Sequence, residues 1–304
     1  MNVIGIDTSN YTTSIAWFDG TSGVNCSRLL PVKQGELGLR QSDAVFAHIK
    51  SLPELSGRLF SDVKIDAVGV STRPRAVEGS YMPCFMVGYS HAKLLSDVFR
   101  VPLIEVSHQQ GHVAASLWSA GHMELLDVPH LAWHLSGGTT ELLLVAPEGK
   151  NVVCTRIGGT TDISAGQLID RTGQLLNLPF PSGKALDALS SQAVQTQVFQ
   201  VKCSAASFSL SGVQNKVQQY YEGNPDPAET AAYALRCVAG AVYRATEQAL
   251  RQYPGLRVVF SGGVASNSLL RRVMQPLDPI FAQPQYSTDN AMGVAVLAHR
   301  MTEE

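Results

Sequence analysis

Two stretches with one layout decide the fold: I-G-I-D-T-S-N-Y-T-T-S-I-A-W-F-D-G at residues 4–20, and L-A-W-H-L-S-G-G-T-T-E-L-L-L-V-A-P-E-G at residues 131–149. Each starts as an apolar strand and turns through Gly, Ser and Thr. Each then continues as an amphipathic strand and ends in an acidic–Gly turn. A strand, a tight polar turn and a second strand predict a β-hairpin. The sequence therefore predicts an internal duplication in which each half begins with a hairpin.

Apolar periodicity predicts the remaining elements. The first half is expected to hold strands at 2–8, 12–19, 24–32, 65–71 and 102–106, a turn at Ser9–Tyr11, and helices at 41–60, 79–100 and 108–120, the first of them interrupted at Pro53. The second half is expected to hold strands at 141–146, 151–157 and 256–260, and helices at 164–177, 183–198, 209–221, 226–253 and 291–302. This alternation is typical of an α/β protein. We expect domains at 1–125 and 126–289, with the last helix, about 290–304, packing back on the first.

Composition narrows the class of protein. The 304 residues are 45% hydrophobic and 16% charged, enough for a sizeable core. No run of about 18 apolar residues predicts a membrane span, and the N-terminus lacks a secretion signal. Five scattered cysteines without a C-x-x-C pair indicate a reducing compartment, so a cytoplasmic protein is expected. With a net charge of −2, binding of nucleic acid would need a local basic patch or a partner subunit.

The stretch S-H-Q-Q-G-H at residues 107–112 places two imidazoles at the start of a predicted helix. Side chains at i and i+4 share one helix face, with Cβ atoms ~5–6 Å apart. His108 and His112 could therefore share a zinc or iron ion. The alternative is that they cap the helix or pack against its neighbours.

Three turns rich in Gly, Ser and Thr follow apolar strands, at 7–12, 136–140 and 261–267. Small residues let backbone N–H groups approach phosphate oxygens, and a helix N-terminus favours anions. One such turn is usually only a turn. Two duplicated hairpin turns followed by S-G-G-x-x-x-N resemble the fold shared by actin, sugar kinases and chaperone ATPases. That duplicated actin-like, sugar-kinase-like ATPase fold holds a nucleotide in a cleft between two domains. It hosts kinases, ATPases and carbamoyl transferases alike.

Seven motifs in order resemble one branch of this fold, the tRNA threonylcarbamoyl-adenosine transferase family. The family is also called the glycoprotease or O-sialoglycoprotein endopeptidase family (peptidase M22). The motifs are V-x-H-x-x-x-H, S-G-G, G-x-x-x-D-x-x-A-G-x-x-x-D, P-x-G, F-S-x-S-G, G-G-V-A-x-N and S-T-D-N. They stand at Val106–His112, Ser136–Gly138, Gly158–Asp170, Pro181–Gly183, Phe208–Gly212, Gly262–Asn267 and Ser287–Asn290.

The resemblance implies a metal site. His108 and His112 match the family's two metal-ligating histidines, and Asp289 matches its third ligand. A His₂–Asp set leaves coordination positions open, as a catalytic metal requires. Iron or zinc is the expected ion, with Mg²⁺ as a further cation beside a bound nucleotide. The alternative for Asp289 is an N-cap of the last helix.

The resemblance also implies an adenylate site. The Ser136–Gly138 turn matches the substrate phosphate loop, Asp170 matches a residue that binds ribose hydroxyls, Gly183 a glycine on which the nucleoside packs, and Asn267 the asparagine of the adenine loop. The alternatives are a solvated helix face for Asp170 and a helix N-cap for Asn267. The full set is His134, Leu135, Ser136, Gly137, Gly138, Asp170, Gly183 and Asn267, with secondary phosphate loops at Thr8, Ser9, Gly262 and Gly263.

The reaction implied by the resemblance is carbamoyl transfer. The donor would be L-threonylcarbamoyl-adenylate, and the expected small-molecule partner is this adenylate or, alternatively, ATP or AMP. The acceptor would be the exocyclic amine of an adenosine beside the anticodon of tRNA. AMP is a good leaving group, so the enzyme mainly positions and polarises its substrates. Helper proteins and a homo- or hetero-dimer are the expected partners.

The chain departs from the family pattern at residues 10–12, 73–78, 139 and 167, where it reads N-Y-T, R-P-R-A-V-E, Thr and Gln. These changes indicate a divergent paralogue. One alternative is a catalytically altered, nucleotide-binding scaffold in a tRNA-modification complex. Another is a kinase or ATPase of the same fold, in which Asp7 would serve a Mg²⁺ ion. A peptidase is not supported, because the histidine pair lacks the glutamate of H-E-x-x-H.

Overall fold

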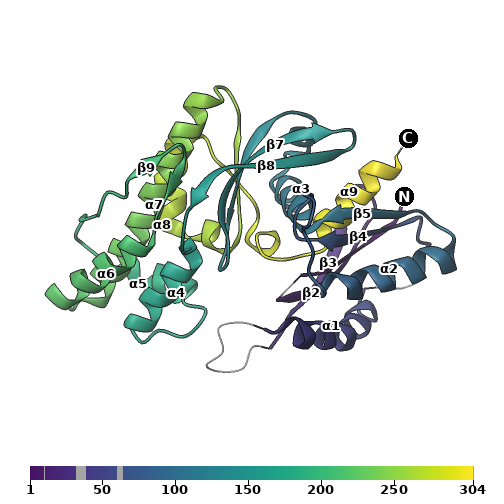
Figure 1. The fold of residues 1–304 in the computed structure, drawn as a ribbon, viewed down its shortest axis with the longest axis horizontal. Helices are drawn as coiled ribbons and strands as arrows, with labels where there is room; N and C mark the ends of the chain where they lie inside the picture. The colour runs from purple at the N-terminus through teal and green to yellow at the C-terminus, as the bar shows by residue number, and fades with distance from the viewer. Residues whose placement is uncertain (10, 32–38, 60–63, 304) are drawn as a thin grey trace. The chain divides into compact units, whose positions relative to one another are not determined.

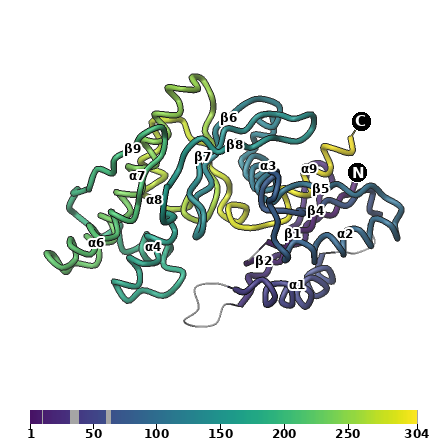
Figure 2. The backbone as a smooth tube through the Cα atoms, in the orientation of Figure 1, coloured from purple at the N-terminus to yellow at the C-terminus, as the bar shows by residue number. Residues whose placement is uncertain are grey.

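A computed structural model describes residues 1–9, 11–31, 39–59 and 64–303. The expected turn residue Asn10 and the expected element ends at Val32 and Phe60 lie outside the described residues. Contacts divide the chain into two units. The first holds Met1–Val128, Ala146–Cys154 and Asp289–Glu304, and the second holds Pro129–Val145 and Thr155–Thr288. The tip of the second hairpin, Ala146–Cys154, thus belongs to the first unit, which the repeat pattern did not predict. Figure 2 traces the course of the backbone from the N-terminus to the C-terminus.

The first unit is built on a sheet in the order β3-β2-β1-β4-β5. β1 pairs antiparallel with β2 and parallel with β4, so the predicted hairpin is confirmed. The strands are β1 Val3–Thr8, β2 Thr12–Phe18, β3 Gly23–Leu29, β4 Ala67–Arg73 and β5 Leu103–Ser107. The helices are α1 Gln41–Ser56, α2 Phe85–Phe99, α3 His108–Ala120 and α9 Met292–Thr302 (Figure 1).

Alternation along the central strands assigns each side chain to a face of this sheet. On β1, Ile4 and Ile6 pack in a core with residues of α1 and α2. On the opposite face, a Cβ at Gly5 would lie 2.5 Å from the carbonyl oxygen of Ala291 and 2.7 Å from the amide nitrogen of Ala295. Glycine at this position therefore lets the start of α9 lie directly on the sheet.

α3 and α9 pack at unusually close range. A Cβ on Gly293 would lie 1.8 Å from the carbonyl oxygen of Gly111 and 2.6 Å from the amide nitrogen of Ala115. Only a residue without a side chain fits at position 293. Because Gly111 lies between His108 and His112, this contact brings the start of α9 to the histidine pair.

The second unit repeats the strand order of the first. β8-β7-β6-β11-β12 corresponds to β3-β2-β1-β4-β5, and β10 and β9 extend the sheet beyond β8. β6 is antiparallel to β7 and parallel to β11, which confirms the predicted duplication. The strands are β6 His130–Leu135, β7 Thr140–Glu148, β8 Asn151–Thr160, β9 Cys203–Ser204, β10 Ser207–Phe208, β11 Val258–Ser261 and β12 Ile280–Phe281. The helices are α4 Ala165–Leu175, α5 Gly183–Ser190, α6 Ser211–Gly223, α7 Pro227–Gln252 and α8 Ser268–Met274.

Two predicted helices were too long. The helix predicted at 79–100 begins only at Phe85, after the left-handed Gly79 and after Pro83. The helix predicted at 183–198 ends at Ser190. Beyond it, the amide of Val194 donates to the buried carboxylate of Glu229, and the chain leaves the helix.

Other features complete the fold. The predicted interruption at Pro53 is wrong, because α1 continues through Pro53 to Ser56. The two-residue strands β9, β10 and β12 are too short to show a period in the sequence. Among the described residues, no helix is both long and apolar enough to cross a bilayer. The cleft expected between the two halves stays a prediction.

Candidate active site

The first turn of α3 is fixed by a reciprocal cap. The Ser107 hydroxyl accepts a hydrogen bond from the Gln110 amide at 3.2 Å, and the Gln110 side chain accepts one from the Ser107 amide at 2.7 Å. Such a capping box sets where a helix begins. His108 is therefore the first helical residue, and His112 lies one turn further on the same face.

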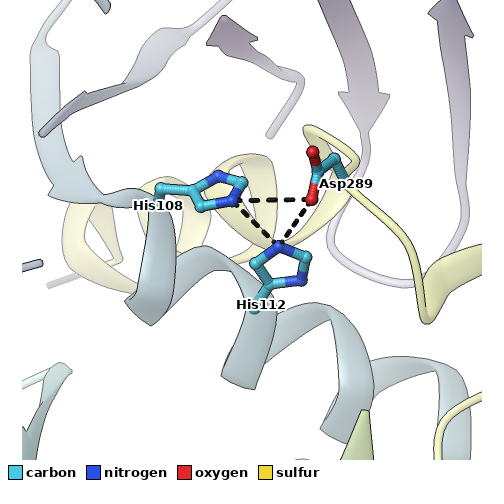
Figure 3. Close-up of side chains that lie close together, drawn as sticks. All are labelled: His108, His112 and Asp289. Atoms are coloured by element: carbon cyan, nitrogen blue, oxygen red, sulfur yellow. Dashed lines mark hydrogen bonds and ion pairs between the residues drawn. The ribbon is translucent and has the colours of Figure 1, made fainter. Parts of the chain in front are cut away.

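Asp289 joins the two histidines from the other end of the first unit's sequence. Its Oδ1 lies 3.1 Å from Nε2 of His112 and 3.6 Å from Nε2 of His108, and the two Nε2 atoms are 3.0 Å apart (Figure 3). The carboxylate does not cap α9, since the amide of Met292 is bound by the Asn290 side chain at 3.0 Å. The N-cap alternative for Asp289 is thus not what the structure shows.

The three ligand atoms have the spacing of a metal site. Ligands ~2.0–2.2 Å from one ion lie ~2.8–3.6 Å from each other at octahedral to tetrahedral angles. The separations of 3.0, 3.1 and 3.6 Å fit this range, and two nitrogens with one carboxylate oxygen suit iron or zinc. The His112 side chain is 4% exposed, whereas the Asp289 side chain is 28% exposed, so the cluster can be reached from one side.

Charge at the cluster is set by its carboxylates. Burial lowers the pKa of His108, but the nearby Asp7 and Asp289 carboxylates outweigh burial and raise it to about 10. Burial raises the pKa of Asp289, but hydrogen bonds from His108 and His112 hold it well below its usual value. The two carboxylates therefore favour a positive charge at the cluster.

The end of β1 lies beneath this cluster. The Asp7 carboxylate is 3.0 Å from Nδ1 of His108 and accepts a hydrogen bond from the Ser71 hydroxyl. The Ser9 hydroxyl donates to Oδ2 of Asp289 at 3.0 Å. Thr8 points to the opposite face, where its hydroxyl donates to the carbonyl of Cys84. Thr8 and Ser9 were expected in a phosphate loop, but both hydroxyls are bound within the protein.

In the second unit, the expected phosphate loop is tied to the first turn of α4. The Ser164 hydroxyl donates to the carbonyl of Gly137 at 2.6 Å. A Cβ on Gly166 would lie 2.4 Å from Cα of Gly137 and 2.5 Å from the carbonyl oxygen of Ser136. Gly137 and Gly138 are exposed, so their backbone is accessible to a ligand. The turn is thus accessible on one side and supported by a helix N-terminus on the other.

The second glycine turn lies against the same strand end. Gly262 has a φ of +90°, and a Cβ there would lie 2.1 Å from the carbonyl oxygen of Leu135. Gly263 is exposed, with nothing near its Cβ position among the described atoms. Leu135 itself is fully buried in the core, so only its backbone can face a ligand. His134 is half-buried at the end of β6, opposite Ser261.

Asn267 is held by protein contacts at both ends of its amide. Its oxygen caps α8 by accepting from the Leu270 amide at 2.9 Å, as the N-cap alternative predicts. Its nitrogen donates to Asp187 at 2.8 Å, and Ser268 also donates to Asp187. Asp187 lies one helical turn after Gly183 in α5, so α5 and the 262–267 turn are joined at this point.

Asp170 and Gly183 lie at the same junction between α4 and α5. Asp170 accepts a hydrogen bond from the amide of Ser182 at 2.8 Å through Oδ1, and burial raises its pKa despite that bond. A Cβ on Gly183 would meet only Ile169, at 4.0 Å, so one face of this glycine is open. The structure brings Asp170, Ser182 and Gly183 together, and ribose binding by Asp170 stays a prediction.

The changed positions have local explanations in part. Gln167 completes a capping box with Ser164, so it keeps the acceptor oxygen that glutamate would supply. The amide of Thr139 donates to the Ser136 hydroxyl at 3.0 Å. Arg73 pairs in register with Ser107, and the carbonyl of Pro74 accepts from the Gln109 amide. The altered turn after β4 therefore lies beside the start of α3.

Three acidic residues with contacts at these sites were not assigned to them from the sequence. The sequence indicates Asp7 only as a possible Mg²⁺ carboxylate, although its alternation with Gly5 along the strand places both residues on one face of the sheet. Asp187 could have been found from its i+4 spacing to Gly183. Asp162 is the first aspartate of the motif at Gly158–Asp170, and it accepts hydrogen bonds from the hydroxyls of Ser209 and Ser211 and from the amide of Leu210, a contact that the motif did not predict.

Solved structures with this architecture show which fold the chain has. Full-length HypF, in its phosphate- and nucleotide-bound form, matches with a TM-score of 0.65 at 16% identity, covering 100% of this chain and 47% of the HypF chain. A ROK family glucokinase from Streptomyces griseus matches with a TM-score of 0.55 at 12% identity, covering 99% and 100% of the two chains. The chain therefore has the actin-like, sugar-kinase-like ATPase fold, as predicted.

Sequence comparison then gives the family. The TsaD family model, described as tRNA N6-adenosine threonylcarbamoyltransferase, matches residues 40–296. A tRNA N6-adenosine threonylcarbamoyltransferase of Carboxydothermus hydrogenoformans is 33% identical over 253 residues, which cover 80% of this chain and 73% of the relative. The chain belongs to the TsaD family, so the resemblance seen in its motifs is confirmed.

Proposed function

We propose that this protein transfers a threonylcarbamoyl group from an adenylate donor to an adenosine beside the anticodon of tRNA. Membership of the TsaD family supports transfer to tRNA. The convergence of His108, His112 and Asp289 is the observation that supports a metal-dependent reaction. Because the net charge is −2, helper proteins are expected to supply part of the grip on tRNA.

The residues of this chain would supply a metal site in the first unit and an adenylate site in the second. His108, His112 and Asp289 would hold iron or zinc, which when bound supplies Lewis-acid polarisation of an acyl or phosphate oxygen. The exposed backbone of Gly137 and Gly138 would bind the adenylate phosphate. Since AMP is a good leaving group, holding the reactants in line accounts for most of the rate gain expected.

The nucleoside half of the donor would bind at the junction of α4 and α5. The carboxylate of Asp170 keeps Oδ2 for a ribose hydroxyl after Oδ1 accepts from Ser182. The open face of Gly183 leaves room for a flat ring. The amide of Asn267 is bound to Asp187 and to α8, so it would shape the adenine loop rather than contact the base through a free side chain.

A kinase of the same fold is disfavoured by the position of Asp7. Phosphoryl transfer needs carboxylates available to Mg²⁺. Asp7 is fully buried, and one of its oxygens contacts both His108 and Ser71. The carboxylate that would bind Mg²⁺ in a kinase therefore contacts the histidine cluster instead.

The test is transfer of the group to tRNA in vitro. Unmodified tRNA is incubated with the protein, L-threonylcarbamoyl-adenylate, Fe²⁺ or Zn²⁺ and the helper proteins of the same organism. The tRNA is then digested, and its nucleosides are identified by mass spectrometry. The Carboxydothermus hydrogenoformans relative is the positive control. We expect threonylcarbamoyl-adenosine from both proteins. Product from the relative alone, while this chain still binds AMP, would contradict the proposal and favour a nucleotide-binding scaffold.

A further inference from the structure

The carboxyl end of β1 places polar side chains directly under the histidine cluster. Residues 3, 5, 7 and 9 alternate with residues that face α1 and α2, so they share the face covered by α9. Gly5 lets α9 lie against the strand, and Asp7 and Ser9 follow it on the same face. Each of these two side chains contacts one of the three expected ligands, His108 and Asp289 respectively.

The contact between Asp7 and His108 determines which ring nitrogen is free for a cation. Nδ1 of His108 lies 3.0 Å from Oδ1 of Asp7, and a carboxylate at this distance accepts a hydrogen bond. With its proton on Nδ1, the ring presents the Nε2 lone pair, which is the atom 3.0 Å from His112 and 3.6 Å from Asp289. Partners of this kind fix the tautomer and orientation of metal-binding histidines.

Burial of the Asp7 carboxylate costs free energy, which argues that this residue has a role at the site. Its side chain is 0% exposed, and its Oδ2 has no hydrogen-bond partner among the described residues. The contacts of Oδ1 are the Ser71 hydroxyl and the His108 ring. A buried carboxylate with so few partners is unfavourable unless a positive charge lies nearby. A cation held by the histidine cluster would provide that charge.

We propose that Asp7 is a positioning residue of the metal site, which holds the proton of His108 on Nδ1 and so directs Nε2 toward the cation. Ser71 orients the Asp7 carboxylate from the neighbouring strand, and Ser9 orients Asp289 in the same way. This inference rests on the proposed metal-binding function of His108, His112 and Asp289. It adds to that function a set of residues on β1 and β4 that contact the ligands, and of these Asp7 selects the tautomer of His108.

The test measures Zn²⁺ affinity by competition with a coloured chelator, in wild type and in Asp7→Asn, Asp7→Ala and Ser14→Ala. Loss of such a partner typically weakens metal binding by about 10–100-fold. We expect this loss for Asp7→Ala and a smaller one, about 10-fold, for the isosteric Asp7→Asn. Ser14→Ala is the matched control, because Ser14 is equally buried and its hydroxyl donates to the backbone carbonyl of Asp7 rather than to the carboxylate. Its Zn²⁺ affinity should stay at the wild-type value.

A second readout separates positioning from support of the fold. In the Zn²⁺-loaded wild type, ¹⁵N-edited NMR should show a slowly exchanging proton on Nδ1 of His108, and Asp7→Asn should speed its exchange. Wild-type Zn²⁺ affinity in folded Asp7→Asn would overturn the inference. The inference would also fail if Asp7→Asn lost binding of ATP–Mg²⁺ while its Zn²⁺ affinity stayed at the wild-type value. If wild type and His108→Ala bind Zn²⁺ equally weakly, the proposed metal site fails instead, so the two failures are distinguishable.

Discussion

Alanine at position 166 should push on the expected phosphate loop. The new Cβ would lie 2.4 Å from Cα of Gly137 and 2.5 Å from the carbonyl oxygen of Ser136, where ordinary contact begins near 3.4 Å. The loop must therefore move by about 1 Å, since both neighbours are backbone atoms. Such overpacking costs about 1–3 kcal/mol, against a gain of at most about 1 kcal/mol from alanine in a helix. We expect Gly166→Ala to lower the free energy of unfolding by about 1–2 kcal/mol.

The same displacement should weaken the nucleotide site. Moving a binding group by about 1 Å can cost on the order of 100-fold in rate, so we expect AMP affinity in Gly166→Ala to fall by at least about 10-fold. Gly212→Ala is the matched control, since Gly212 is also the second residue of its helix and has nothing within 4 Å of its Cβ position among the described atoms. It should be neutral or more stable by up to about 1 kcal/mol. Urea unfolding and calorimetry measure both effects, and identical behaviour of the two variants would refute the reasoning.

Three further substitutions test other contacts of the second unit. Ser164→Ala removes the cap of α4 and should lower unfolding stability by about 0.5–2 kcal/mol in urea titrations. Asp187→Asn weakens the charged contact to Asn267, and calorimetry should show AMP binding weaker by about 3–10-fold. Burial raises the pKa of Asp162, but hydrogen bonds from two serines and two backbone amides hold it below its ordinary value. The stabilisation by ionised Asp162 is therefore present above the pKa that this carboxyl has in the unfolded chain, and it is lost as pH falls through the lower pKa of the folded state. Urea titrations should show Asp162→Asn less stable at neutral pH, with the difference shrinking in acid.

Much of the fold could be predicted because the chain repeats a recognisable unit. The hairpins at 4–20 and 131–149 predicted the duplication, and both sheets show the same strand order. The errors lay where tertiary contacts override the local pattern. The carboxylate of Glu229 accepts a hydrogen bond from the amide of Val194, beyond the end of α5 at Ser190. Because Glu229 is distant in sequence from α5, no local pattern shows this contact.

The expected ligands of the candidate site could be predicted from the sequence, but the residues that contact those ligands could not. The spacing of His108 and His112 indicated a shared face, and the family resemblance supplied Asp289, because no local pattern joins residues so far apart. The close approach of α9 at Gly293 explains how they meet. The contact of Asp7 with His108 depends on pairing between strands, which the sequence does not show until the sheet order is known.

Metal content tests most directly the central claim, which is that a working His₂–Asp centre persists although neighbouring loops differ from the family pattern. Protein purified without chelators is analysed for iron and zinc by mass spectrometry, beside His112→Ala. Because the three ligand atoms are already grouped, we predict about one ion per chain in wild type and a loss of about tenfold or more in the variant. Equal metal content in the two proteins, or none in wild type after addition of Fe²⁺ or Zn²⁺, would contradict the account.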